Sequence, residues 1–295
     1  MLRPIITATM CLATIVALGR QAAVSAEVAD PRIDEARASL AQGDARRAAG
    51  LAGEVLADDA KNRAAFAVRA AAYDVLEDYD RSVADWSRVI DLDPRAAEAF
   101  DRRGSAHFKL GHIGPAIADF DRFIQLRPAA AAGHWRRGIA YYYAKRFDEG
   151  RRQFEAYQSV DNNDVENAVW QNLCIAAADG VPAARKRMMR VGQDRRVPMM
   201  MIDALFRGKA TPDQVVSAAT AGRPSPERLQ RRLFYAHLYL GLYYESLGET
   251  TKSLAHIKKA VHQYKVKGYM WEVARVHESL RAAAPGDRKA VKPAK

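Results

Sequence analysis

The sequence predicts an all-α protein, a solenoid of antiparallel helix pairs with a helical insertion and a C-terminal capping helix. Three observations support this prediction. Pro94 and Pro128 lie 34 residues apart, and Gly104 and Gly138 lie 34 residues apart as well. No segment alternates apolar and polar residues as a half-buried strand does. A period of this length is typical of stacked helical hairpins, which cannot bury their apolar faces alone.

Composition excludes several protein classes. The 295 residues include 49% hydrophobic and 27% charged residues, which indicates one or two globular domains. Two cysteines are too few for a disulfide framework or a zinc cluster. The formal net charge of +11 favours anionic partners or surfaces without identifying one.

Residues 1–26 have the pattern of a secretory signal peptide. Arg3 precedes an uncharged apolar run over 4–18, and small residues follow up to Ala26. The run is shorter than the roughly 20 residues of a membrane-spanning helix, although an uncleaved anchor is the alternative. Cys11 follows Met10, whereas a lipoprotein signal needs a small residue there. We therefore expect cleavage after Ala26 and a periplasmic or secreted protein.

Four successive blocks over 27–164 share one residue pattern. A large residue is followed by a small one four positions later, then by an aromatic residue, a second small residue, further apolar residues and a closing proline. In the block that begins at residue 100 these positions are Phe100, Gly104, His107, Ala116, Phe120, Phe123 and Pro128. The blocks from Phe66 and His134 repeat it, and a weaker one contains Ala36. This pattern resembles the tetratricopeptide repeat, in which the small residues let the two helices of a pair approach closely.

Arginine recurs at the seventh repeat position. Arg69, Arg103 and Arg137 are followed sixteen residues later by Asp85, Asp119 and Gln153. The spacing places each pair on facing helices, so we expect structural Arg69–Asp85 and Arg103–Asp119 ion pairs. An arginine cluster that captures carboxylates is the alternative.

The segment 165–233 interrupts the repeats, and we interpret it as a helical insertion. A helix is expected over 165–178, with Cys174 as a buried, unreactive thiol. The basic run from Arg185 to Arg196 is expected to be a solvated helix face, with binding of an acidic partner or lipid headgroups as the alternative. Thr211 and Ser225, each followed by proline, mark two helix starts.

The repeat pattern returns over 234–283. Gly241, Tyr244 and Ser253 fit the same template, and 269–283 is predicted to be a closing helix. We expect the basic tail over 284–295 to be unstructured.

Three segments together resemble the periplasmic lipoprotein NlpI family. They begin at His134 (HWRRGIAYYYAKRFDEGRRQFEAYQSVDNND), Asp203 (DALFRGKATPDQV) and Leu238 (LYLGLYYESLGETTKSL). The resemblance implies an extracytoplasmic adaptor that docks a cell-envelope protease or peptidoglycan enzymes and that forms a homodimer. The lipobox of that family is missing here.

Helix A of each repeat lines the concave face of such a solenoid, which predicts a partner-binding groove. The residues expected in it are Glu98, Asp101, Phe108, Lys109, Trp135, Tyr142, Tyr143 and Tyr235. Trp135, Tyr142 and Tyr143 form an aromatic stripe, and aromatic residues are frequent binding hot spots. The alternative is that the insertion or the closing helix fills the groove.

No catalytic motif is present. The sequence lacks HExxH, GxSxG and GxxxxGK[ST], so we expect no enzyme, no cofactor and no metal site. The preferred interpretation is a protein-interaction scaffold without a nucleic-acid partner. A basic protein that binds anionic cell-wall polymer or membrane, and an unrecognised enzyme, are the alternatives.

Overall fold

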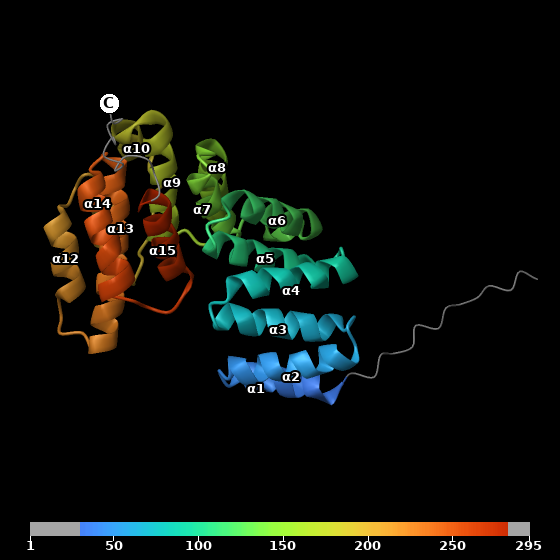
Figure 1. Ribbon diagram of the computed structural model, residues 1–295. Coiled ribbons are helices and arrows are strands. Elements are labelled where there is room, and N and C mark those ends of the chain that lie inside the picture. Colours follow the sequence, from blue (N-terminus) through green and yellow to red (C-terminus); the bar gives the residue numbers. More distant parts are fainter. Residues whose placement is uncertain (1–29, 283–295) are drawn as a thin grey trace, which may run out of the picture.

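A computed structural model describes residues 30–282 of the chain (Figure 1). The predicted signal peptide over 1–26 and the predicted tail over 284–295 lie outside these residues. Within 30–282 the secondary structure is entirely helical. The α-helices are α1 (Pro31–Ala41), α2 (Ala45–Asp58), α3 (Arg63–Val75), α4 (Tyr79–Leu92), α5 (Ala97–Lys109), α6 (Ile113–Leu126), α7 (Trp135–Tyr143), α8 (Phe147–Tyr157), α9 (Val165–Asp179), α10 (Val181–Arg187), α11 (Met199–Phe206), α12 (Pro212–Thr220), α13 (Pro226–Ser246), α14 (Thr250–Lys258) and α15 (Tyr269–Ala282).

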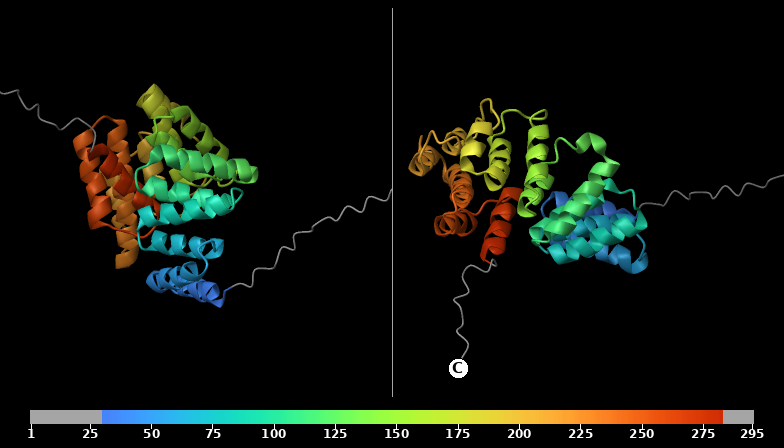
Figure 2. Two further views of the ribbon diagram at one scale, coloured as in Figure 1. Left: turned by 45° about the vertical axis from the view of Figure 1, so that its right-hand side comes forward. Right: turned by 90° about the horizontal axis from the view of Figure 1, so that it is seen from above.

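The helices form a curved stack of pairs, with the last helix on its inner side. Figure 1 shows α1 to α6 stacked one above another, with each helix packed on the next along the chain. The pairs α7–α8 and α9–α10 follow, and α12 to α14 lie on the side of the molecule opposite α1 to α6 (Figure 1). The view from above in Figure 2 shows α15 inside this curve, where it contacts α5 and α14.

Close packing within a repeat depends on glycine. A Cβ atom added at Gly104 would lie 2.8 Å from the ring of Phe120, and one at Gly138 would lie 2.7 Å from the ring of Phe154. Both rings are fully buried between the helices. These glycines let the two helices of a pair approach closely, as predicted, and they do so by making room for the ring sixteen residues later.

The two expected ion pairs are present. Asp85 accepts hydrogen bonds from Arg69 at 2.7 and 2.8 Å, and Asp119 accepts two from Arg103 at 2.8 and 2.7 Å. Both carboxylates are buried, while the arginines remain partly exposed. These bidentate bonds join helix A to helix B of the second and third repeats.

The predicted helix starts are also observed. The Thr211 hydroxyl accepts from the Gln214 N–H at 3.3 Å, and the Gln214 side chain accepts from the Thr211 N–H at 2.8 Å, which completes a capping box. Ser225 caps α13 through the N–H of Arg228 at 3.4 Å. Because α13 begins at Pro226, it crosses the predicted boundary between insertion and late repeat at 233/234.

The segment 165–233, predicted to be an insertion, contains α9 to α12 and the start of α13. Cys174 in α9 is 1% exposed, and burial raises the pKa of its thiol to about 12, as expected for an unreactive cysteine. The prediction of a basic helix face over 185–196 is wrong for its second half. Helix α10 ends at Arg187, and the chain is irregular from 188 to the start of α11. Arg196 in this irregular segment binds Asp164 and Asp194 at 2.7 and 2.6 Å.

Candidate protein-binding groove

Helix α15 covers the centre of the concave face. Phe108 is fully buried and stacks on Tyr269 of α15, with 5.6 Å between ring centroids. The Tyr143 hydroxyl lies 3.1 Å from Nδ1 of His277, also on α15. Phe108 and Tyr143, which we expected to face a partner, are therefore not open to one in this structure.

Tyr142 is not open to a partner either. Its hydroxyl donates to Glu245 of α13 at 2.8 Å, and Glu245 also accepts a hydrogen bond from Arg281 of α15. Burial and the nearby Glu245 carboxylate raise the pKa of Tyr142 well above its ordinary value. Two of the three aromatic side chains of the predicted stripe thus serve packing, Tyr143 against α15 and Tyr142 against α9 and α13. This corresponds to the alternative in which the insertion or the closing helix fills the groove.

The first turns of α15 are bound to the repeats by polar contacts. Glu272 is 6% exposed; it accepts from the Tyr79 hydroxyl and from Arg275 at 2.9 Å. Arg275 also donates to the carbonyl oxygen of Lys109 at the end of α5. These bonds connect α15 to the second and third repeats.

An open part of the concave face remains beside α15, on the side of the first helices. This cavity of about 470 Å³ is called here the amino-terminal groove. Its lining residues are Leu40, Ala71, Asp74, Val75, Trp86, Arg102, Ser105, Lys109, Arg136 and Tyr269. Lys109 is the one residue of the predicted set that lines it, and Val75 at its lip is 59% exposed.

The polar groups of the amino-terminal groove differ between floor and rim. The Asp74 carboxylate accepts from the Ser82 hydroxyl at 2.9 Å, and burial raises its pKa. The cationic rim consists of Arg102, Lys109 and Arg136. The groove therefore combines a buried carboxyl group with basic side chains and a short apolar lip.

Asp101 and Glu98 have different surroundings from those expected. Asp101 binds Nε2 of His134 at 2.9 Å and the guanidinium of Arg136 at 2.6 Å, so its carboxylate is already bonded within the chain. Glu98 is exposed and lies 3.5 Å from Arg127. Asp101 thus joins the third repeat to the fourth through His134, which lies 33 positions later in the sequence. We did not predict this contact from the sequence.

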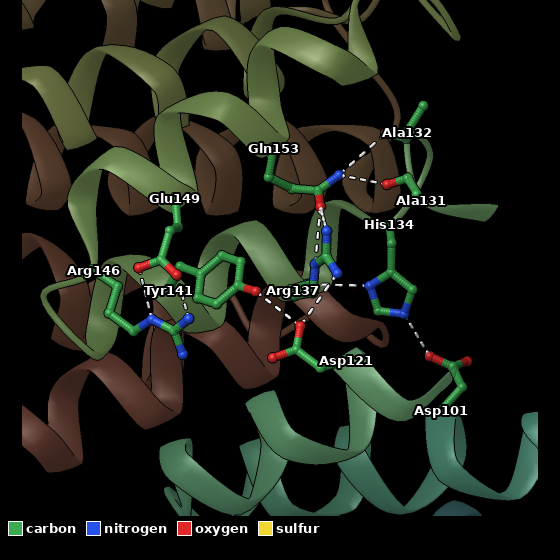
Figure 3. A network of polar contacts seen from close by, with 10 residues as sticks. All are labelled: Asp101, Asp121, Ala131, Ala132, His134, Arg137, Tyr141, Arg146, Glu149 and Gln153. Carbon is green, nitrogen blue, oxygen red and sulfur yellow. Dashed lines mark hydrogen bonds and ion pairs between the residues drawn. The ribbon is translucent and has the colours of Figure 1, made fainter. Parts of the chain in front are cut away.

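A polar network continues from this link into the fourth repeat (Figure 3). Arg137 donates to Gln153 at 3.0 and 2.8 Å and to Asp121 at 3.2 Å. His134 accepts from the Arg137 N–H at 3.3 Å. Because the Arg69, Arg103 and Arg137 guanidinium groups are all bonded within the chain, we find the structural interpretation of these arginines supported over carboxylate capture.

Trp135 and Tyr235 are half-buried and line a second cavity on the other side of α15. It measures about 300 Å³ and lies between α7, α9, α13 and the segment that precedes α15. A smaller chamber of about 70 Å³ adjoins it and shares Trp135, Asp164, Glu166 and Met270 as lining residues. Asn167 and Trp170 of α9, which sequence reasoning did not select, also line the chamber and are nearly fully buried.

The described residues, 30–282, contain neither a metal-binding cluster nor a membrane-spanning helix. In this part of the chain no three His, Cys, Asp or Glu side chains are placed to hold a metal ion. None of the described helices has the length and apolar character needed to span a bilayer. In the basic run, the exposed cations without an ion pair are Arg185, Lys186, Arg190 and Arg195.

Comparison with known proteins identifies the fold. No protein-family model and no curated protein matches the chain. Among solved structures, a tetratricopeptide repeat protein from Parabacteroides merdae superposes with a TM-score of 0.56 at 13% identity, over 85% of this chain and 98% of that one. The MamA protein superposes with a TM-score of 0.50 at 20% identity, over 53% of this chain and 85% of that one. The chain therefore has the fold of a tetratricopeptide repeat solenoid.

Proposed function

We propose that this protein is an extracytoplasmic interaction scaffold that binds a segment of a partner protein in the amino-terminal groove. The observation that carries the proposal is the position of α15. It covers the aromatic centre of the concave face but leaves a groove of about 470 Å³ uncovered between α1, α3 and α5.

The groove chemistry favours a particular kind of segment. Lys109 and Arg102 at the rim attract acidic side chains, because opposite charges at a partly desolvated rim attract one another. Ala71 and Val75 are apolar lining residues, and a small apolar side chain of a partner could pack against them. We therefore expect an extended or helical segment that carries both acidic and small apolar residues.

The compartment and the class of partner rest on the sequence. The signal-peptide pattern over 1–26 supports export, and the resemblance to the NlpI family supports a cell-envelope protease or a peptidoglycan enzyme as partner. Homodimer formation belongs to the same proposal. Amino-terminal sequencing of the protein isolated from cells should find Glu27 as the first residue, whereas a chain that begins at Met1 would contradict cleavage.

In-cell photocrosslinking tests the groove. We expect a photoreactive residue at Val75 to capture a partner that the same residue at Val160 does not capture, since Val160 is 57% exposed outside the groove. Mass spectrometry identifies the captured protein. Arg102→Glu should remove this crosslink while the melting temperature is unchanged within about 2 °C, as is usual for substitutions of an exposed side chain. Equal capture at both valines, or capture that survives Arg102→Glu, would contradict the proposal.

A further inference from the structure

The amino-terminal groove reaches Tyr269, the first residue of α15, and a second cavity begins on the other side of this residue. Tyr269 lines both the groove of about 470 Å³ and the second cavity of about 300 Å³. A third cavity of about 540 Å³ continues from the second, because Tyr235, Val266 and Lys267 line both. The three cavities therefore follow one another across the start of α15.

The boundary between the groove and the second cavity consists of partly exposed side chains. Trp135 meets Tyr269 edge to face, with 5.2 Å between the ring centroids. The guanidinium group of Arg136 lies 5.9 Å from the centroid of the Trp135 ring and 5.7 Å from that of the Tyr269 ring. A chain that crosses here meets an aromatic surface with a cation beside it.

Positive charge predominates along the solvent side of the three cavities. The carboxylates of Asp164 and Glu166 in the second cavity both bind Arg196, at 2.7 and 2.6 Å. Of the described lining residues, Glu227 is the one acidic residue that is exposed. Four lining cations form no ion pair within residues 30–282, and they are Arg102 and Lys109 in the groove and Arg231 and Lys267 beyond α15.

The second cavity has the lining of an apolar binding site. A volume of about 300 Å³ lies at the lower end of the range for ligand pockets, which is enough for one large side chain. Aromatic and apolar residues make up most of its wall, and they are Trp135, Phe234, Tyr235, Val266, Tyr269, Met270 and Trp271. Such a wall favours a large apolar side chain of a partner.

We propose that one acidic segment of the partner protein runs from the amino-terminal groove across Tyr269 into the second cavity. Its acidic side chains face Arg102 and Lys109 on one side of α15 and Arg231 and Lys267 on the other, and a large apolar side chain occupies the second cavity. A helix is about 10 Å wide and an extended chain advances about 3.3 Å per residue, so a segment with contacts on both sides spans about ten residues. This inference rests on the proposed function and adds the path and the second anchor of the segment.

Photocrosslinking at two positions of the full chain in cells tests the path. A photoreactive residue is placed at Val75 in the groove or at Val266 in the second cavity, and fragment mass spectrometry locates the crosslinked residue of the partner. We expect both positions to capture the same protein, at residues within about ten positions of one another in an acidic segment. Two different proteins, distant parts of one protein, or a second copy of this chain at Val266 would overturn the inference. Capture at Val75 alone overturns the path and leaves the proposed function standing, whereas no capture at Val75 overturns both.

Charge reversal beyond α15 provides a second test that keeps Val266. Lys267→Glu should weaken the Val75 crosslink about fivefold, because an attractive charge on the far side of α15 becomes a repulsive one. Lys186→Glu is the matched control, since Lys186 on α10 is exposed, forms no ion pair within residues 30–282 and lines none of the three cavities. Equal Val75 crosslinks in the two variants would overturn the inference, and the proposed function would still stand on the effect of Arg102→Glu.

Discussion

At the scale of single residues, the spacing of sixteen positions governs each repeat. It places Gly104 under the ring of Phe120, and it places Arg103 opposite Asp119. The neighbouring residues 103 and 104 therefore contact the neighbouring residues 119 and 120. One sequence interval thus sets both the close approach of two helices and the ion pair that joins them.

The first prediction concerns this close approach. We expect Gly104→Ala to lower the free energy of unfolding by about 1–2 kcal/mol, because the new methyl group overlaps the fully buried Phe120 ring. Gly50→Ala is the matched control, since Gly50 lies in the middle of α2 with nothing within 4 Å of its added Cβ. It should raise stability by about 0.5–1 kcal/mol through helix propensity. Urea denaturation of both variants checks this, and a stabilised Gly104→Ala would show that the packing is loose.

The second prediction concerns the ion pair. Arg103→Ala leaves the Asp119 carboxylate buried without its partner, so we expect the free energy of unfolding to fall by about 3 kcal/mol. The double variant Arg103→Met with Asp119→Leu should lose clearly less, because it removes the uncompensated charge as well. Thermal denaturation of the two variants gives the comparison. An unchanged melting temperature in Arg103→Ala would contradict a structural role for this arginine.

At the scale of elements, α15 decides how much of the concave face is available. Its side chains reach Tyr79 in α4, Tyr143 in α7 and Glu245 in α13. The fully buried His277 lies at the centre of this contact. Because these bonds join helices far apart along the chain, docking of α15 links the repeats to the last helix pair.

The third prediction concerns the pH dependence of this docking. Burial, opposed in part by Glu245, lowers the pKa of His277 from 6.5 to about 4. Between these two values the unfolded chain binds a proton that the folded chain does not, so stability falls as the pH falls from about 6.5 to 4. We expect the loss between pH 7 and 4.5 to be smaller by about 2 kcal/mol in His277→Phe than in the unchanged chain.

Denaturation at the two pH values measures this difference. His237, whose pKa burial and the neighbouring His256 also lower to about 4, remains in the variant, so a residual pH dependence is expected. Identical losses in the variant and the unchanged chain would contradict the assignment to His277.

At the scale of the whole molecule, the buried apolar residues form two main clusters. One runs from Ile33 to Ala99, and the other runs from Phe108 to Val276. In solenoids each repeat contacts mainly its neighbours, so stability is spread along the chain rather than concentrated in one core.

The fourth prediction follows from this division. Phe66→Ala in the first cluster should lower the free energy of unfolding of that cluster by about 3 kcal/mol. Hydrogen exchange followed by mass spectrometry should then show faster exchange in α1 to α4 and unchanged exchange in α9 and α13. An equal increase throughout 30–282 would indicate a single cooperative unit instead.

Several local features were predictable because they depend on residues within one repeat or one turn. The Arg69–Asp85 pair, the Thr211 capping box and the inert environment of Cys174 belong to this class. The groove was less predictable. Helix position alone placed Tyr142 and Tyr143 on the concave face, but it could not decide between an open groove and one that other helices cover.

A stack of helix pairs could be inferred from the amino-acid sequence, because a period of 34 residues reflects the contacts that each repeat makes within itself and with the next. Which part of the concave face is open depends instead on contacts between distant segments of the folded chain. The contacts of α15 join residues 134 and 193 positions apart, as in Tyr143 with His277 and Tyr79 with Glu272. Such contacts leave no periodic pattern in the chain, because they form once, where the solenoid curves back on its own last helix.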